Sequence, residues 1–387
     1  MLTTFVIAFI SACREPYAPP SIKNDNHYLV VNGFINSGND STIFFLSRTV
    51  GLTDSTISPP ELNAQVSILG KFGENFMLTA FGNGEYATGS LTLNPAETYQ
   101  LHIITSNGEE YLSDSIPVLQ TPPIDSLNWR QDLTSASNKL GVNIYVNTHD
   151  PTNLARYYRW EYVETWEYHA QYDSYYFYDS DLNQVLPRDT SAHTYACYRS
   201  RNSTDLELST TEKLSQDIIY EYPLVFIPKG DEKLSAHYSL LVKQYAISKE
   251  AYNYWQSLKS STELTGSIFD PQPSQITGNV HSLSNPGEPV LGFISASYAQ
   301  ESRIFITQQQ IAQWGYVNPN QCDTVFVPAI SDSLKYYFRA RGYAPIQQVP
   351  PEIIGTQRRG AGWYGAYPSC IDCTLAGGTT SKPAFWP

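Results

Sequence analysis

The chain has 387 residues, 41% of them hydrophobic and 16% charged, and its formal net charge of −13 gives an isoelectric point near 5.0. This charge argues against nucleic acid as a partner, because binding to phosphate backbones needs concentrated positive charge. The length allows a substantial core in more than one domain, and 29 Tyr and 25 Pro against 2 Met are typical of a β-rich protein with polar loops.

A short apolar segment at the start of the chain ends at Cys13. Residues 5–12 are too few to span a bilayer as a helix, and the small residues Ser11 and Ala12 precede the cysteine, as a lipoprotein signal peptidase requires. We therefore expect a signal over residues 1–13 that ends at a lipidated Cys13, the alternative being a chance apolar segment on a cytoplasmic protein. Residues 14–26 are polar and contain three prolines, which predicts a flexible tether.

Short apolar runs with strand periodicity occupy residues 27–120. Residues 28–31, 42–46, 64–68 and 76–78 are rich in β-branched and aromatic residues and are separated by Gly, Asn, Asp and Pro, which predicts a β-sandwich. Residues 99–103 and 111–113 flank Asn107-Gly108, a pair that tolerates positive φ at both turn positions, so we expect a β-hairpin. Three prolines in residues 117–123 are expected to break the ladder and close this domain.

The second domain, residues 121–387, is expected to be larger and mainly β, with a few short inserted helices. Ser248 is a suitable N-cap for a helix whose residues Ala251, Trp255 and Leu258 share one face. A second short helix is expected to begin at Thr307, where Gln310 completes a capping box, and to stop at Gly315.

The densest aromatic stretch covers residues 157–178. In a strand, five of its rings would share one face, and such a row could form the inner face of a sandwich or a ligand- or partner-binding surface on which a sugar or peptide stacks. The five are Tyr158, Trp160, Tyr162, Trp166 and Tyr168.

Four cysteines remain after Cys13, namely Cys197, Cys322, Cys370 and Cys373. An even number in an oxidising compartment predicts two disulfides, with three connectivities open. The alternatives are a four-thiolate zinc site or a redox pair at Cys370 and Cys373.

The remaining motifs give little evidence of a catalytic or ligand-binding site. Residues 360–365 fit G-x-G-x-x-G by letter but leave no room for a βαβ unit. Residues 179–183 begin like a calcium loop, but Gln184 stands where the sharp turn needs glycine, which favours a solvated turn. We find no catalytic motif, metal site or cofactor site, so a non-enzymatic protein is expected.

Several segments together resemble the domain-of-unknown-function 4249 lipoproteins of Bacteroidota. They are residues 197–200, 211–215, 252–255, 266–273, 278–281, 289–293, 370–374, 377–378 and 382–387. The resemblance implies an outer-membrane lipoprotein with an N-terminal immunoglobulin-like or transthyretin-like sandwich, encoded beside TonB-dependent receptors, and no established activity. Surface-exported members often carry several acidic residues after the cysteine, whereas this chain has Glu15, so the membrane face is left open.

Six Asp-Ser or Asp-Thr pairs resemble the acceptor for periplasmic O-glycosylation in the same bacteria, although such pairs also arise in ordinary turns. The candidate acceptors are Ser41, Ser55, Ser115, Ser126, Thr324 and Ser333.

Three functions follow as hypotheses. The first is a non-enzymatic binding or accessory subunit, held to the outer membrane by its lipid and docked on a TonB-dependent β-barrel receptor. The second is a surface glycan- or peptide-processing enzyme with carboxylates from unlinked loops, and the third is a purely structural envelope protein.

Overall fold

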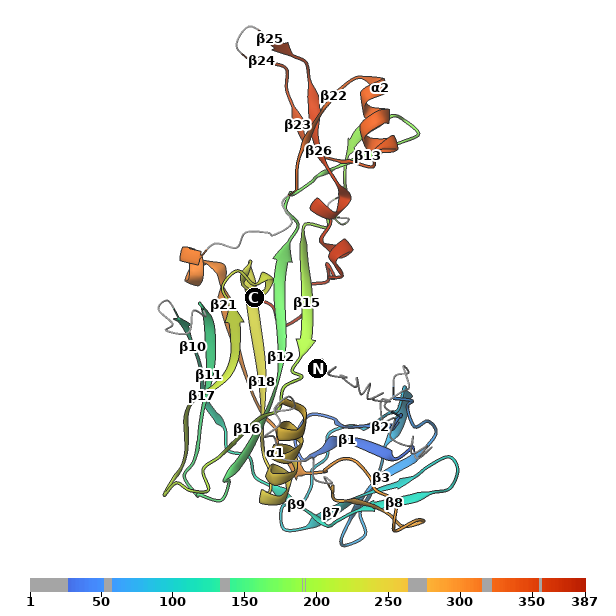
Figure 1. The fold of residues 1–387 in the computed structure, drawn as a ribbon, viewed down its shortest axis with the longest axis vertical. Helices are drawn as coiled ribbons and strands as arrows, with labels where there is room; N and C mark the ends of the chain where they lie inside the picture. Colours follow the sequence, from blue (N-terminus) through green and yellow to red (C-terminus); the bar gives the residue numbers. More distant parts are fainter. Residues whose placement is uncertain are drawn as a thin grey trace, which may run out of the picture.

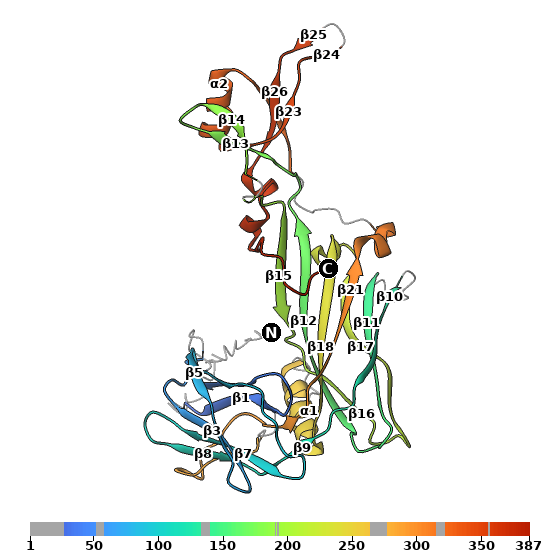
Figure 2. The same cartoon turned by 180° about the vertical axis from the view of Figure 1, so that it is seen from behind.

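The computed structural model describes residues 27–51, 58–132, 140–189, 191, 193–263, 277–314, 322–354 and 357–387. The described part of the chain forms three units: a β unit of 11 strands hydrogen-bonded into one sheet, which we call the sandwich, a barrel-like β body, and a narrow arm at the end of the body opposite the sandwich (Figure 1). Figure 2 shows the same arrangement from behind. The expected mainly β fold is confirmed. The predicted signal and tether lie outside the described residues.

The sandwich forms from short strands whose apolar residues alternate. Its first strands are β1 (Leu29–Asn36), β2 (Thr42–Arg48), β3 (Gln65–Gly70), β4 (Asn75–Met77), β5 (Thr79–Gly82), β6 (Glu85–Thr88), β7 (Thr98–Ile104), β8 (Glu110–Ser113) and β9 (Ile116–Leu119). In β2, Phe44 and Leu46 are buried whereas Ile43 and Phe45 are exposed. This period of two places one face of each strand in the core.

The predicted hairpin is confirmed as β7 and β8, which pair antiparallel with Ile103 opposite Tyr111. Its turn differs from the expected one, because only Gly108 has a positive φ, at 86°, and Asn107 does not. The Asn107 side chain instead accepts a hydrogen bond from the Glu109 backbone N–H. A single left-handed residue after a tighter turn is a common solution for longer hairpin loops.

The sandwich ladder ends within the proline-rich segment, as expected, because β9 ends at Leu119 and the next strand, which begins at Ile124, belongs to another sheet. The first of the three prolines, however, does not break the ladder. Pro117 lies inside β9, opposite Thr98 of β7. Proline is tolerated there because β9 is a short strand in which the missing N–H is not needed for pairing.

A distant segment returns to complete the sandwich, which the sequence did not predict. Strand β19 (Val280–Ser282) pairs with β8, and β20 (Ala296–Ser297) lies parallel between β1 and β9. Two glycines permit the close approach. A Cβ on Gly292, whose φ is +136°, would lie 2.0 Å from the Val31 carbonyl oxygen, and a Cβ on Gly278 would lie 1.7 Å from the Gly292 oxygen. Any larger side chain would force these segments apart.

The barrel-like body encloses the largest core between two curved sheets. One sheet contains β10 (Ile124–Asp132), β11 (Gly141–Asp150) and β17 (Asp217–Pro228). The other contains β15 (Ala196–Asn202), β12 (Tyr157–His169), β18 (His237–Ala246) and β21 (Gln300–Thr307), with β16 (Glu207–Thr210) also paired to β12. Apolar residues of both sheets, such as Val142, Trp160 and Leu240, form one cluster.

A buried polar network ties this core together. Trp160 Nε1 donates to Gln244 Oε1 at 2.8 Å, and Gln244 Nε2 donates to the Pro122 carbonyl and to Thr148 Oγ1 at 2.8 and 2.9 Å. Gln244 is fully buried, so these bonds replace the water that it loses on folding. They join β12, β18, β11 and the segment that leaves the sandwich.

Both predicted helices are present. Helix α1 (Lys249–Glu263) begins after Ser248, whose Oγ accepts from the Ala251 N–H at 3.1 Å. The second is a 3-10 helix, η3 (Gln308–Trp314), and Gln310 Oε1 accepts from the Thr307 N–H at 2.8 Å, as a capping box requires. The expected stop at Gly315 lies outside the described residues.

The arm combines two segments far apart in sequence. It contains β13 (Tyr176–Asp179), β14 (Gln184–Pro187), β22 (Val325–Pro328), α2 (Ser331–Leu334), the helical turn η4 (Lys335–Ala340), β23 (Ala344–Val349), β24 (Glu352–Ile354), β25 (Gln357–Arg359) and β26 (Gly362–Ala366). The short helices η5 (Pro368–Cys370) and η6 (Cys373–Ala376) follow. Val327, Phe338 and Trp363 form its small core.

Two motifs of the sequence fall in the arm. The last four residues of the G-x-G-x-x-G match, 362–365, lie on β26, between β22 and β23, so the match is not a phosphate-binding loop. The Asp179 loop is the turn between β13 and β14, where Asp179 Oδ1 accepts from the backbone N–H groups of Asp181 and Leu182. This is the solvated turn that the sequence favoured.

Candidate functional site

The aromatic row of β12 faces the core of the barrel-like body. Its five rings are at most 8% exposed, because the sheet of β10, β11 and β17 covers the inner face of β12. A binding surface made of all five rings is therefore contradicted by their burial. The rings are Tyr158, Trp160, Tyr162, Trp166 and Tyr168.

A carboxylate interrupts this apolar row, and the sequence analysis missed it. Glu164 lies between Tyr162 and Trp166 on the inner face and is 4% exposed. Lys233 Nζ lies 2.8 Å from both of its carboxylate oxygens, and the Tyr238 hydroxyl donates to Oε1 at 2.9 Å. Burial, with Glu164 beside it, raises the pKa of Tyr238 well above its usual value. A charged residue in an alternating aromatic row was the signal that could have revealed it.

A cavity of about 440 Å³ opens beside this ion pair, between β17 and the connection from β15 to β16. We call it the side cavity. Tyr162 lines it, and burial together with the nearby carboxylates of Asp205 and Glu164 raises the pKa of its phenol to about 12. Its other lining residues include Asn143, Arg201, Phe226 and Lys233.

A second cavity of about 540 Å³, the junction cleft, lies between the sandwich and the body. The Phe34 and Tyr245 rings, one from each unit, pack 4.6 Å apart along it. Lys243 Nζ lies 3.2 Å from Asp40 Oδ2 and 2.6 Å from Glu301 Oε1, which places an ion-pair network across the junction. The connection from β15 to β16 lines both cavities.

The two expected disulfides are confirmed, and the structure gives their connectivity. Cys197 on β15 pairs with Cys373, and Cys322 pairs with Cys370. Cys370 and Cys373 therefore do not form a redox pair with each other. The four sulfurs are oxidised, so they do not provide the thiolates that the zinc alternative requires.

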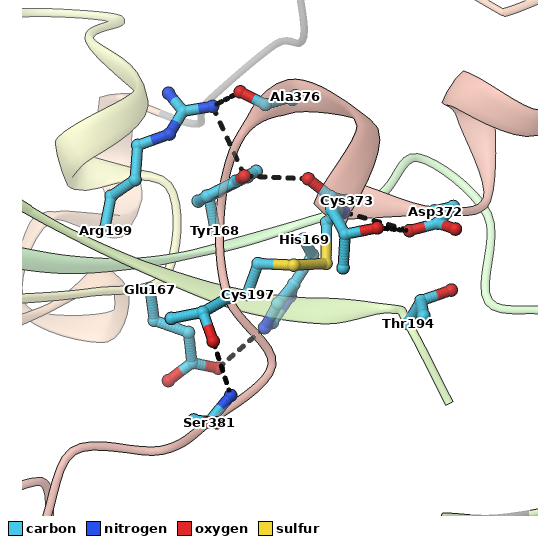
Figure 3. The surroundings of a disulfide bond; sticks show 12 residues. Glu167, Tyr168, His169, Thr194, Cys197, Arg199, Asp372, Cys373, Ala376 and Ser381 are labelled. Carbon is cyan, nitrogen blue, oxygen red and sulfur yellow. Dashed lines mark hydrogen bonds and ion pairs between the residues drawn. A yellow bond between two sulfur atoms is a disulfide. The ribbon is translucent and has the colours of Figure 1, made fainter. Parts of the chain in front are cut away.

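The first disulfide fastens the C-terminal tail to the body (Figure 3). The Tyr168 hydroxyl donates to the Cys373 carbonyl at 2.8 Å, and Arg199 donates to the Ala376 carbonyl. Further along the tail, the Trp386 ring packs edge-on against Tyr198 of β15. The tail thus joins the core of the body at Cys373, beside Tyr168, and then crosses to the outer face of the sheet, where Trp386 packs.

Glu167 organises polar contacts on this outer face. Its carboxylate lies 2.7 Å from His169 Nε2 and 3.2 Å from His237 Nδ1, and it accepts from Trp386 Nε1 at 3.1 Å. The hydrogen bond from His169, aided by those from His237 and Trp386 and opposed by burial, lowers the pKa of Glu167 to about 2.

This lowered pKa predicts acid sensitivity. A carboxylate with a depressed pKa stabilises the folded chain above its unfolded pKa near 4.5, and the contribution disappears as the pH falls toward 2. Glu167→Gln is expected to remove about 2–3 kcal/mol at pH 7 and to flatten the loss of stability between pH 5 and pH 2. Urea unfolding across this range measures both effects.

The matched control for this measurement is Glu85→Gln on β6, which should keep the wild-type acid profile. A Glu167→Gln variant with the wild-type profile would contradict the assignment of the acid sensitivity to Glu167.

Four tyrosines of the arm contact one another in a row, in which the two end residues are exposed and the two middle ones, Tyr337 and Tyr343, are half-buried against the core of the arm. Ring contacts run from Tyr336 to Tyr337 at 5.0 Å, from Tyr337 to Tyr343 at 6.2 Å, and from Tyr343 to Tyr367 at 4.5 Å. Tyr336 is 53% exposed and Tyr367 is 49% exposed. We call these four residues the tyrosine ridge. Ile330, 61% exposed, lies just before α2 on the same arm.

The candidate glycosylation acceptors lie in different settings. Ser41, Ser115 and Thr324 are exposed, whereas Ser126 and Ser333 are half-buried. Ser41 lines the junction cleft. Cys13 and Ser55 lie outside the described residues.

Within the described ranges, no group of three or more His, Cys, Asp or Glu side chains is arranged to hold a metal ion. In the same ranges, no helix has the length and apolar character needed to cross a membrane.

Comparison with known families gives one match. The model of a family described as "Domain of unknown function (DUF4249)" matches residues 14–303, which include the sandwich and most of the body, up to β21. No curated protein matches the chain. Because the match spans well over half of the sequence, the chain belongs to the domain-of-unknown-function 4249 family.

Proposed function

We propose that the protein is an outer-membrane lipoprotein that acts as a non-enzymatic accessory subunit and docks on a TonB-dependent β-barrel receptor through its arm. The observation that carries the proposal is the tyrosine ridge. Large aromatic side chains exposed together on a projecting element are typical of protein interaction sites.

The arm also has the rigidity that a docking element needs. The disulfide between Cys322 and Cys370 closes its base, and Tyr176 packs edge-on against the buried Trp363 at 4.8 Å. A preorganised surface loses little conformational entropy on binding, so its exposed rings contribute more to affinity.

Charge supports a protein partner for the same surface. The chain is acidic overall, with a net charge of −13, yet Lys335, Arg339 and Arg341 are exposed on and beside the helical turn that carries Tyr336. Local positive charge on an acidic protein can steer an acidic partner toward the ridge.

The anchor and the compartment form part of the proposal. Two structural disulfides suit an oxidising envelope compartment. A lipid at Cys13 would hold the chain at the outer membrane through the tether of residues 14–26. O-glycosylation at exposed acceptors such as Ser115 is compatible with this location.

The test is co-purification from native membranes. The tagged full-length protein is extracted in mild detergent, and we expect a β-barrel receptor in stoichiometric amount. Truncating hot-spot aromatic residues weakens binding strongly, so the double variant Tyr336→Ala with Tyr367→Ala is expected to reduce the recovered receptor at least about tenfold.

Phe72→Ala is the matched control, because Phe72 is 75% exposed but lies on the sandwich. It should recover as much receptor as the wild type. Cys13→Ala should move the protein from the membrane to the soluble fraction. The proposal would be contradicted if the wild-type protein purified without a receptor, or if the ridge variant recovered as much receptor as the wild type.

A further inference from the structure

The side cavity has the size of a small-molecule site. Its volume of about 440 Å³ falls within the range of roughly 300–1,000 Å³ that is usual for ligand pockets. It lies between β17 and the connection from β15 to β16, and this connection follows the end of β15 that is farther from the arm (Figure 1).

A tyrosine in its wall presents its hydroxyl to the cavity. Tyr162 is 8% exposed and lines the cavity, and within the described part of the chain no hydrogen bond joins its hydroxyl to another residue. The hydroxyl is not one of the fully enclosed side-chain atoms that lack a partner, so it is accessible from the cavity. It can therefore donate a hydrogen bond to a ligand hydroxyl and accept one from it.

The charges around the cavity nearly balance. Glu164 is neutralised by Lys233 at 2.8 Å, and Arg201 and Asp205, which carry opposite charges, are both exposed lining residues. Glu207, a further lining carboxylate, accepts from the Tyr222 hydroxyl at 2.8 Å. A strongly charged ligand would therefore gain little electrostatic attraction from this site.

The remaining lining groups suit a polyhydroxylated ligand. Asn143 and Asn202 each offer a donor and an acceptor, as do the hydroxyls of Ser203 and Thr204. Phe226 adds an apolar ring that is 39% exposed. Sugars present both hydroxyls that donate and accept and C–H faces that pack on aromatic rings.

We propose that the side cavity binds one unit of a neutral saccharide, with the Tyr162 hydroxyl and the Asn143 amide bonding to its hydroxyls. The inference deepens the proposed function, since it gives the accessory subunit a ligand class, and it rests on that role as a binding subunit. It assigns no catalytic step to the cavity.

The experiment measures saccharide binding to the full-length protein in a detergent without a sugar headgroup. The probes are maltotriose, cellotriose, xylotriose, mannotriose and chitotriose. Saturation-transfer NMR and calorimetry measure their binding. We expect at least one of these saccharides to bind. Tyr162→Phe is expected to weaken the affinity for that saccharide about tenfold, because it removes one hydroxyl. Arg201→Ala, at an exposed lining position, should weaken it less.

Tyr145→Phe is the matched control, because Tyr145 lies on β11 but does not line the side cavity. It should bind as the wild type does. Binding of none of the five probes, or equal binding by Tyr162→Phe and the wild type, would overturn the proposal.

The saccharide experiment and the receptor experiment test different surfaces, so their outcomes are independent. The ridge variant Tyr336→Ala with Tyr367→Ala should still bind the saccharide, and Tyr162→Phe should still recover the receptor. Failure of one experiment therefore does not produce failure of the other.

Discussion

Replacing Cys197 and Cys373 together with serine is expected to lower the free energy of unfolding by about 3–5 kcal/mol. The two residues are 176 positions apart, so their bond restricts a very long loop in the unfolded chain. The loss should also free the tail, because the contacts of Tyr168 with Cys373 and of Arg199 with Ala376 depend on the same anchor. Denaturant unfolding of the oxidised protein measures the difference.

The second disulfide provides the comparison. Cys322 and Cys370 are 48 positions apart, so their replacement by serine is expected to cost about 1 kcal/mol less than the first replacement. This second replacement should destabilise mainly the arm. The backbone amides of β12 and β18 should remain protected from hydrogen exchange. If the free energy of unfolding of the Cys197 and Cys373 variant lay within about 1 kcal/mol of the wild-type value, the anchoring role of this disulfide would be contradicted.

Lys233→Met is expected to destabilise the body by about 3–5 kcal/mol. The change removes the only ion-pair partner that Glu164 has within the described structure, and leaves a carboxylate that is 5% exposed without its counter-charge. An unpaired buried charge is strongly unfavourable, whereas a nonpolar pair in its place is often tolerated. Thermal and denaturant unfolding at pH 7 measure the loss.

A double variant distinguishes charge from packing. Adding Glu164→Gln to Lys233→Met removes the buried charge and should restore much of the lost stability. Lys229→Met, at an exposed position on the adjacent turn, serves as the control and should change stability by less than about 0.5 kcal/mol. A double variant as unstable as Lys233→Met alone would show that the charge is not the cause.

Local patterns in the sequence predicted much of the architecture. The alternation of apolar residues located β1 to β4 and the hairpin of β7 and β8, because burial on one face of a strand imposes a period of two. Ser248 and Gln310 marked the starts of two helices because capping depends on neighbouring residues alone. The number of disulfides followed from the cysteine count.

Long-range pairing could not be predicted in the same way. The pairing of β20 with β1 and β9 involves two residues on β20, Ala296 and Ser297, that have no strand pattern of their own. The partners of Cys197 and Cys322 depend on how the body and the arm fold, and cysteine spacing alone allowed three connectivities. Periodicity identifies a buried face but not what covers it.

The candidate sites show the same limit. The aromatic row of β12 was recognised, but only the structure shows that it faces the core and that Glu164 interrupts it beside the side cavity. The tyrosine ridge joins Tyr336 to Tyr367 through ring contacts within the arm. Neither site has a compact motif in the sequence, because each assembles residues from separate elements.

Site-specific photocrosslinking in intact cells tests directly whether the arm docks on a β-barrel receptor. A photoreactive amino acid replaces Tyr336 on the tyrosine ridge, and a second strain carries it in place of Phe72 on the sandwich. We expect an adduct with a β-barrel outer-membrane receptor from position 336 and none from position 72. No receptor adduct from position 336, or the same adduct from both positions, would contradict docking through the arm.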